Sequence, residues 1–401
     1  MKRTEDRWGK PLWKVTFRPK RRALPERVDF AVVGGGFAGL SAAAHLARMT
    51  HGKSVLLLEA SELGAGASGR TGGLALADSA AGKLRGLGNV LAGYQKILRQ
   101  MGVRNALTLP GVWELGRGGE ALDPKDKNVQ PMKNSAIAWN DSGRLGVVRS
   151  VSGGMADPGR VVAGLARAAE RAGAQIAEDA EVCGIEFGDA LRLKVRERVG
   201  RKMRMKIVVA EKVLFTTNAG SLDLTALQSE AQPKLTFAVA TEALTRGQIS
   251  ELGLASGRPF YTLDLPYVWG RLAKGRRIVF GSGLVPDFRT RAGRSSPWGF
   301  MTRFDVRKGQ AAARVGWLEK RVRALHPVLR NVRITHRWGG PIVFTKDFRP
   351  VFRRHPRSPR VLILGAFAGH GVALSVYLGR WAAQALLGKR KLPQWKAPQR
   401  G

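Results

Sequence analysis

Near the start of the chain, apolar residues fall into two short runs on either side of a small-residue segment. "VDFAVVGGGFAGLSAAAHLARM" (28–49) reads as a buried strand, a glycine turn and an alanine-rich helix. "KSVLLLEA" (53–60) reads as a second buried strand. Two short apolar strands around a helix predict a βαβ unit with a parallel sheet.

Comparable signals return later in the chain. Asp157 is placed as the N-cap of a helix with Pro158 in its first turn, and Gly173 is placed as its C-terminal cap. Strands are expected within 175–187 and 206–220. A final strand, turn and helix are expected within 361–388.

The segments between these blocks have weaker periodicity and an antiparallel character. Their expected strands are "PGVWELG" (110–116), "NSAIAWN" (134–140), "KLTFAVATEAL" (234–244), "PYVWGRLA" (266–273) and "RRIVFGSG" (276–283). The pattern predicts an α/β fold: a doubly wound, Rossmann-like FAD/NAD(P)-binding domain with an interleaved, mainly antiparallel-sheet substrate domain.

The expected division follows from these blocks. It comprises a basic N-terminal arm (1–26), a discontinuous nucleotide domain (27–85, 150–228 and 331–390), a substrate domain (86–149 and 229–330) and a basic C-terminal tail (391–401).

Composition narrows the class of protein. The uncharged segment 361–379 is long enough to span a bilayer, but the glycines around His370 break it into a strand, a turn and a helix, so no transmembrane segment is expected. The single cysteine, Cys183, excludes an internal disulfide and a cysteine-based zinc site, and no metal is expected. It also fits a reducing compartment, and we expect a cytoplasmic protein.

The formal net charge of +38 is spread along the chain. Such a charge predicts nonspecific contact with polyanions. A solvated basic surface is the favoured interpretation over a dedicated nucleic-acid role, because no zinc-finger or RNA-recognition motif is visible.

Glycines 34, 36 and 39 form a G-x-G-x-x-G pattern directly between the first strand and the helix. They permit a tight turn, a close approach of a pyrophosphate, and helix–strand packing. Glu59 ends the next strand, where a carboxylate binds ribose hydroxyls and disfavours NADP. A second glycine-rich loop follows in "LEASELGAGASGRTGGLALAD" (58–78), which suggests a cofactor that lies across the domain, as FAD does. Its mix of alanine with glycine and its apolar end favour a packed loop over a flexible one.

These two motifs together resemble the D-amino-acid-oxidase-like FAD superfamily. The loop "GASGRTGG" (66–73) is most similar to its γ-glutamylputrescine oxidase branch, except that Thr71 replaces an asparagine. "VLFTTNAG" (213–220), "HRWGGPIVFTKDFRPVF" (336–352) and "LILGAFAGHGVALS" (362–375) resemble later segments of the family. The resemblance implies non-covalent FAD, since Cys183 does not match an attachment position.

It also implies two-electron oxidation of a C–N bond in a small amine to an imine, with O2 or another acceptor reoxidising the flavin. The implied cofactor-binding residues are Gly34, Gly36, Phe37, Ala38, Gly39, Glu59, Ala60, Gly66, Ala67, Ser68, Gly69, Arg70, Gly72, Gly73, Val182, Asn218, Ala219, Gly340, Gly369, His370, Gly371 and Val372.

The candidate catalytic residues are His370, Trp269 and Arg271. Tyr267, Trp269 and Arg271 alternate along one expected strand, so they project from the same face. The alternative for Trp269 and for Trp338 is ordinary packing, and for His370 a hydrogen-bonded turn histidine. Amino-acid oxidases of the family hold the substrate carboxylate with an arginine near 338–341, where this chain has "WGGP".

This departure favours an amine without an α-carboxylate, although Arg271 or Arg349 offers a substitute. Arg70 is expected to support the glycine-rich loop rather than to bind substrate. Three alternatives stay open: a glycine- or sarcosine-like amino-acid oxidase, a flavoenzyme that acts on modified uridine in tRNA, and a non-catalytic or accessory flavoprotein at a membrane surface.

Overall fold

The first sheet has a parallel centre, with strands in the order β9–β2–β1–β12–β19. The structure is a computed structural model, and it describes residues 7–117, 137–285 and 304–395. An antiparallel meander, β10–β11–β12, extends the sheet on one side, and β18 pairs with β19. The strands are β1 (Arg27–Val33), β2 (Val55–Leu58), β9 (Gln175–Ala177), β10 (Ala180–Glu186), β11 (Leu191–Val199), β12 (Lys202–Phe215), β18 (Val351–His355) and β19 (Ser358–Gly365).

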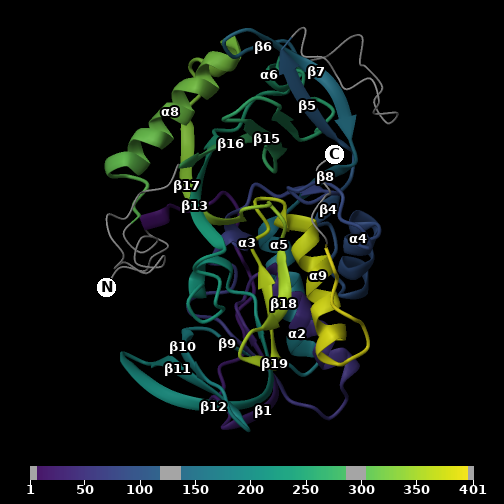
Figure 1. The fold of residues 1–401 in the computed structure, drawn as a ribbon. Coiled ribbons are helices and arrows are strands. Elements are labelled where there is room, and N and C mark those ends of the chain that lie inside the picture. The colour runs from purple at the N-terminus through teal and green to yellow at the C-terminus, as the bar shows by residue number, and fades with distance from the viewer. Residues whose placement is uncertain (1–6, 118–136, 286–303, 396–401) are drawn as a thin grey trace.

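Alternation along the parallel strands divides the core of this half into two layers. Phe30 and Val32 pack with helices α2 (Phe37–Met49), α5 (Pro158–Arg171) and α9 (Gly371–Leu386). Ala31 and Val33 point the other way and pack with residues of β10 and β11. Both faces of the parallel strands are therefore covered, as their continuous apolar sequence requires. Figure 1 shows this half in the lower part of the molecule.

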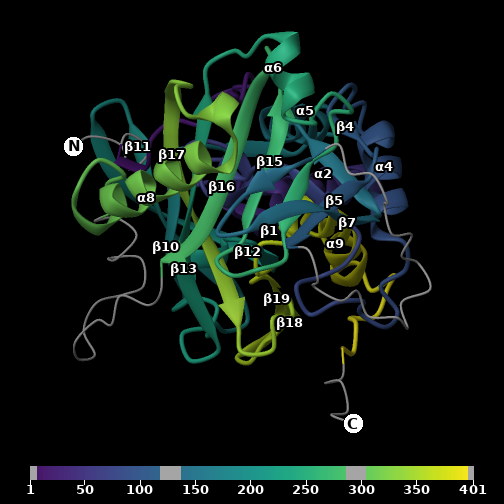
Figure 2. The same ribbon diagram turned by 90° about the horizontal axis from the view of Figure 1, so that it is seen from above.

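The second sheet has the order β17–β13–β16–β15–β14–β5–β7–β6. Its pairs are antiparallel except for β14 with β5. Helices α6 (Arg246–Glu251) and α8 (Gly309–Leu325) share a hydrophobic core with one of its faces. Figure 2 shows these helices on the outer side of the sheet. The strands are β5 (Val112–Arg117), β6 (Trp139–Asn140), β7 (Arg144–Val151), β13 (Ala231–Thr241), β14 (Phe260–Thr262), β15 (Val268–Ala273), β16 (Arg277–Val285) and β17 (Ile334–Thr345).

A small third sheet, β3–β8–β4, lies where the chain passes between the two halves (Figure 1). The remaining elements are β3 (Leu74–Leu76), β4 (Leu107–Thr108), β8 (Gly153–Ala156), α3 (Ala67–Arg70), α4 (Val90–Gln100), η1 (Asn218–Ser221) and η2 (Pro327–Leu329).

The strongest sequence predictions of local structure are confirmed. The βαβ unit is β1–α2–β2. The Asp157 side chain caps α5 by accepting from the Arg160 backbone N–H, and Gly173 follows the helix with a φ of +100°. The segment 361–388 contains the end of β19, a turn and α9.

Two segments of the second sheet differ from what the sequence led us to expect. Ile334–Thr345, which we expected within the nucleotide domain, forms β17 and pairs with β13 in the second sheet. The reason is tertiary: no local pattern in this strand identifies its partner, because β13 lies about one hundred residues earlier in the sequence. In "NSAIAWN", only residues 137–140 lie within the described residues, and Trp139 and Asn140 form β6.

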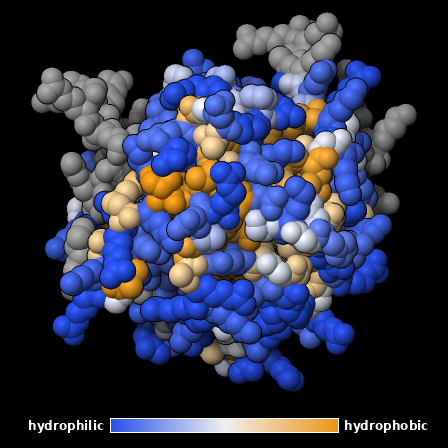
Figure 3. Space-filling view, turned by 90° about the horizontal axis from the view of Figure 1, so that it is seen from below, coloured by the Kyte–Doolittle hydropathy of each residue, from blue (hydrophilic) through white to orange (hydrophobic). Residues whose placement is uncertain are grey.

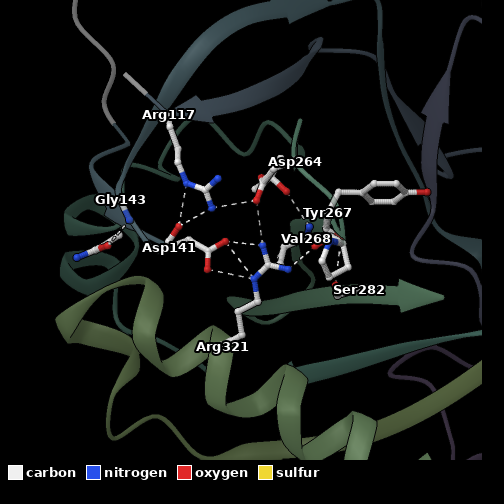
Figure 4. Close-up of polar contacts among 11 residues, drawn as sticks. Arg117, Asp141, Gly143, Asp264, Tyr267, Val268, Ser282 and Arg321 are labelled. Atoms are coloured by element: carbon white, nitrogen blue, oxygen red, sulfur yellow. Dashed lines mark hydrogen bonds and ion pairs between the residues drawn. The ribbon is translucent and has the colours of Figure 1, made fainter. Parts of the chain in front are cut away.

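A network of two arginines and two aspartates ties α8 to the edge of the second sheet. Arg321 of α8 pairs with Asp141 and lies 3.7 Å from Asp264, and Arg117 lies 3.1 Å from Asp264. Figure 4 shows Arg321 pointing from α8 toward both carboxylates, while the ring of Tyr267 points away from them. The network therefore anchors the connection between β14 and β15, from which Tyr267 projects.

Candidate active site

The glycine turn after β1 is closed so tightly that side chains are excluded from it. Gly34 has a φ of +110°, a conformation that favours glycine. A Cβ on Gly39 would lie 2.0 Å from the Gly34 carbonyl oxygen. Phe37 and Ala38 begin α2 and are buried, so the helix starts directly over the turn. This is the geometry that lets a dinucleotide phosphate approach a helix N-terminus.

Glu59 lies beside this turn. Its Oε2 accepts a hydrogen bond from the Gly35 N–H at 2.7 Å, and its Oε1 accepts from the Ser61 N–H at 3.0 Å. The neighbouring Ala60 is exposed, whereas Val182 of β10 is buried in the core below the strand end. A carboxylate at the carboxyl end of β2 and next to the turn is where ribose hydroxyls are bound in this kind of fold.

The second glycine loop contacts the first turn directly. Residues 67–70 form the one-turn helix α3. The Ser68 Oγ accepts from the Phe37 N–H at 2.9 Å, and a Cβ on Gly36 would lie 2.8 Å from that Oγ. The two glycine motifs, some thirty residues apart in the sequence, therefore form one continuous cradle.

Small residues in this loop are required by packing. A Cβ on Gly69 would lie 2.3 Å from the Gly64 carbonyl oxygen, and one on Gly72 would lie 2.0 Å from the Trp269 ring. Gly73 has a φ of +82°, and a Cβ there would lie 2.2 Å from the Ala156 carbonyl oxygen. The interpretation of the loop as packed is confirmed.

Arg70 holds the loop against its surroundings. Its Nε donates to the Ala65 carbonyl at 2.8 Å, and its Nη1 donates to the carbonyls of Gly9 and Gly339 at 2.8 and 3.1 Å. Its guanidinium also lies over the Trp8 ring, 5.2 Å from the centroid. Gly340 leaves room for the stem, since a Cβ there would lie 3.1 Å from the Arg70 Cβ. The support role predicted for Arg70 matches these contacts.

Segments from the C-terminal half close the same region. Asn218 has a φ of +51°, and its Oδ1 accepts from the Ala366 N–H at 3.1 Å. Gly369, with a φ of +89°, and His370 form the turn before α9, which begins at Gly371. Burial lowers the pKa of His370, while a hydrogen bond to the Ala368 carbonyl and the charge of Asp78 raise it. Ala219 and Val372 are buried beside these turns.

One row of directly paired residues crosses the second sheet. Paired residues point to the same face of a sheet, so the row presents its side chains together. In strand order, the row is Trp338, Ala238, Gly281, Trp269, Tyr261, Glu114 and Arg149.

The aromatic end of this row contacts the glycine loop. The Trp338 Nε1 donates to the Arg70 carbonyl at 2.9 Å, and the Trp269 ring packs on Gly72. Trp338 is 1% exposed, so its ring is packing and offers no free surface to a ligand. Trp269 is half-buried.

The other end of the row is polar, and its residues could not be recognised as a group from the sequence. The Tyr261 hydroxyl donates to Glu114, which also pairs with Arg149, and Glu114 is buried. Burial is the main cause that raises the Tyr261 pKa, and the charges of Glu114 and Asp78 add to it. The three residues are brought together only by strand pairing, so no local sequence pattern reveals them.

Arg271 lies two residues after Trp269 on the same face and is 6% exposed. Its guanidinium lies 5.1 Å from the centroid of the Trp13 ring, and its Nε has no hydrogen-bond partner among the described residues. Burial lowers its pKa to about 10. Sequence reasoning also missed Trp13, because its segment has no periodic signal and is placed by contacts more than fifty positions away.

Comparison with known proteins shows the family. The model of the family described as FAD dependent oxidoreductase (DAO) matches residues 29–385. The chain belongs to this DAO family.

Curated relatives agree with this family. The chain is 26% identical to the probable oxidoreductase OrdL of Haemophilus influenzae, over 90% of this chain and 84% of that protein. It is 25% identical to γ-glutamylputrescine oxidoreductase of Escherichia coli, again over 90% of this chain and 84% of the relative. The fold is similar to that of glycine oxidase from Geobacillus kaustophilus, with a TM-score of 0.69, 20% identity, and coverage of 92% of this chain and 96% of that one. The DAO-like α/β fold and an FAD-dependent oxidoreductase are therefore established.

Within residues 7–117, 137–285 and 304–395, no helix has the length and apolar character of a membrane span. No group of three or more His, Cys, Asp or Glu side chains in the same part of the chain is arranged to hold a metal ion.

Proposed function

We propose that this DAO-family protein oxidises the C–N bond of a small primary or secondary amine to an imine, which water then hydrolyses. FAD, when bound, supplies the two-electron acceptor, and O2 or another acceptor takes the electrons onward. The observation that carries the proposal is the contact between the two glycine motifs and the aromatic face of the second sheet, which joins a cofactor cradle to a substrate surface.

The fit of FAD to this chain rests on the cradle. A Cβ at Gly34, Gly36 or Gly39 would lie 2.0 to 2.8 Å from a neighbouring atom, and Glu59 lies beside this turn for the ribose. We assign the pyrophosphate to the turn and the flavin end to residues 66–73, 218–219, 340 and 369–372. Non-covalent binding is supported by Cys183, an exposed residue of β10 that donates to the Lys194 carbonyl.

Helix α9 contributes electrostatically in this proposal. Its first residues follow His370, and the free N–H groups of a helix N-terminus favour negative charge. Such a terminus stabilises the charge that a flavin gains on reduction. We propose that His370 contacts the substrate or the flavin, in the form that its lowered pKa favours, the neutral imidazole.

The two arginines named as substitutes for carboxylate binding, Arg349 and Arg271, each contact other residues of the protein. Arg349 donates to the Trp395 carbonyl at 2.9 Å and lies 3.6 Å from Asp347. Arg271 lies beneath the Trp13 ring. Together with "WGGP" at 338–341, these contacts support an amine without an α-carboxylate.

The name of one relative and the charge of the chain also bear on the substrate. The Escherichia coli relative is named for γ-glutamylputrescine, an acylated amine. The net charge of +38 disfavours a polycation, so we propose a mono- or acylated amine over a free polyamine. The half-buried Trp269 ring suits an alkylammonium group. A cytoplasmic location and the two-domain division stay predictions.

Anaerobic stopped-flow reduction of the flavin tests the proposal. The substrates are matched pairs, each an amine and its α-carboxylated counterpart. We expect the amine of each pair to reduce the flavin faster. If the amino acid is faster, and Arg271→Ala abolishes that preference, the protein is an amino-acid oxidase and the proposed substrate class is wrong. Turnover on tRNA alone would instead identify the modified-uridine reaction.

A further inference from the structure

Residues 7–24, which we call the N-terminal strap, run between the two halves of the molecule. At one end, the Arg7 carbonyl accepts from the Val306 N–H at 2.8 Å. A Cβ on Gly159 of α5 would lie 2.3 Å from the Lys14 carbonyl oxygen, so the strap also packs closely on the first half. The Ala23 carbonyl accepts from the Gln175 side chain at 2.9 Å at the other end. The strap is therefore part of the folded structure and passes beside the candidate site.

Trp13 is the strap residue that reaches the site. Its Nε1 donates to the Gly69 carbonyl at 2.7 Å. Its ring meets Trp338 edge-on, with centroids 5.5 Å apart, and covers the Arg271 guanidinium. The Trp13 indole therefore contacts the second glycine loop at Gly69, the second sheet at Trp338, and the buried Arg271. Trp13 itself is half-buried, so its other side remains accessible.

Arg271 has the properties of a binding group that is covered. No carboxylate of the described residues forms an ion pair with it. Asp157 is the charge that acts on it, and that carboxylate already accepts from the Arg160 N–H at 3.0 Å and lies 3.6 Å from the Arg160 Nε. A buried guanidinium with an unpartnered Nε can bind a carboxylate through charge-assisted, bidentate hydrogen bonds.

We propose that Trp13 is a specificity-determining residue that covers Arg271 and so excludes substrates with an α-carboxylate. The inference rests on the proposed amine oxidation. Its consequence is that removal of the indole ring converts Arg271 into a carboxylate-binding side chain. The strap thereby sets which class of amine the site accepts.

The experiment compares four variants with the wild-type protein, using flavin reduction by the same amine and amino-acid pairs. In Trp13→Ala, we expect reduction by the amino acids to gain roughly 10- to 100-fold relative to the amines, the ratio that hydrogen bonds to a charged group supply. Trp13→Ala/Arg271→Gln should lose that gain. Trp13→Phe keeps a ring over Arg271 but loses the bond to Gly69, so it should still exclude amino acids. Trp317→Ala is the matched control, because Trp317 is 37% exposed and its ring centroid lies 5.4 Å from a different guanidinium, that of Arg321 of α8.

A binding measurement covers the case in which Trp13→Ala does not fold. Benzoate is titrated calorimetrically into wild-type protein and into Arg271→Gln. We expect equal, weak binding, since the ring already covers the arginine. Benzoate binding that is lost in Arg271→Gln would overturn the inference.

The outcomes distinguish a failure of the role proposed for Trp13 from a failure of the proposed function. A wild-type protein that prefers amines, with a folded Trp13→Ala that gains nothing on amino acids, overturns the role of Trp13 and leaves the proposed function intact. A wild-type protein that prefers amino acids overturns both.

Discussion

Two buried arginines near the glycine loop have opposite surroundings. Arg70 donates to several backbone carbonyls, whereas Arg271 has an aromatic ring on one face and an unpartnered Nε. A buried cation with several hydrogen bonds stabilises the structure around it, whereas one with an unpartnered donor keeps a binding capacity, which in Arg271 the Trp13 ring covers. The support role of Arg70 was predictable from its place among glycines. The cover over Arg271 was not, because Trp13 is brought to it by tertiary contacts.

A substitution at Glu59 tests whether the two glycine motifs form the FAD-binding site. Glu59→Lys should weaken FAD binding by about 100-fold, because it removes a charged acceptor of ribose hydroxyls and places a cation there. The measurement is the flavin released by acid, per chain, after dialysis at a series of FAD concentrations. The matched control is Glu251→Lys, the same charge change on the exposed end of α6.

Retention of full flavin in Glu59→Lys would show that the ribose lies elsewhere. The same assay checks non-covalent attachment, since covalently bound flavin stays with the precipitated wild-type protein.

Elements with strong local signals could be predicted, and those that depend on partners could not. β1, α2 and α5 were predictable from apolar periodicity, glycines and a capping aspartate. β17 lies in a segment that we expected within the nucleotide domain, and its local sequence does not reveal that it pairs with β13 of the second sheet. The row from Trp338 to Arg149 requires six strand pairings in register, so only its Trp269 and Trp338 members were singled out from the sequence.

The ion pair between Arg321 and Asp141 attaches α8 to the second sheet, and its contribution to stability can be measured. Arg321 and Asp141 have side chains that are 10% and 11% exposed. Arg321→Met should lower the free energy of unfolding by roughly 3 kcal/mol, because it leaves a largely buried carboxylate without its cation. Chemical denaturation of the FAD-saturated protein measures the change.

Arg323→Met on the same helix is the control. Arg323 is 41% exposed and lies 3.9 Å from Glu319, so its loss should cost less than about 1 kcal/mol. Equal effects of the two substitutions would contradict a special role for the network in Figure 4.

For the molecule as a whole, the charge of +38 is the feature that the oxidation chemistry leaves unexplained. Figure 3 shows the lower face, on the side of the first sheet, as predominantly hydrophilic. The hairpin of β11 and β12 belongs to this half. Arg201 in its turn, and Lys202 and Arg204 at the start of β12, are exposed cations. Arg196 and Arg198 of β11 are paired with Glu181 of β10 and with Asp179 just before it, which leaves the three cations at the hairpin turn as the more available group.

We therefore expect salt-labile, nonspecific binding of polyanions, with the hairpin turn as a principal contributor. Retention on heparin should fall steeply as salt rises, because released counterions drive such binding. Replacing Arg201, Lys202 and Arg204 by glutamine should lower the eluting salt concentration more than replacing the scattered, exposed Arg246, Lys274 and Arg314, although both variants lose three charges. Equal shifts would mean that only total charge matters, as expected for a solvated basic surface. Salt-resistant, sequence-selective binding of tRNA would instead favour the reaction on modified uridine.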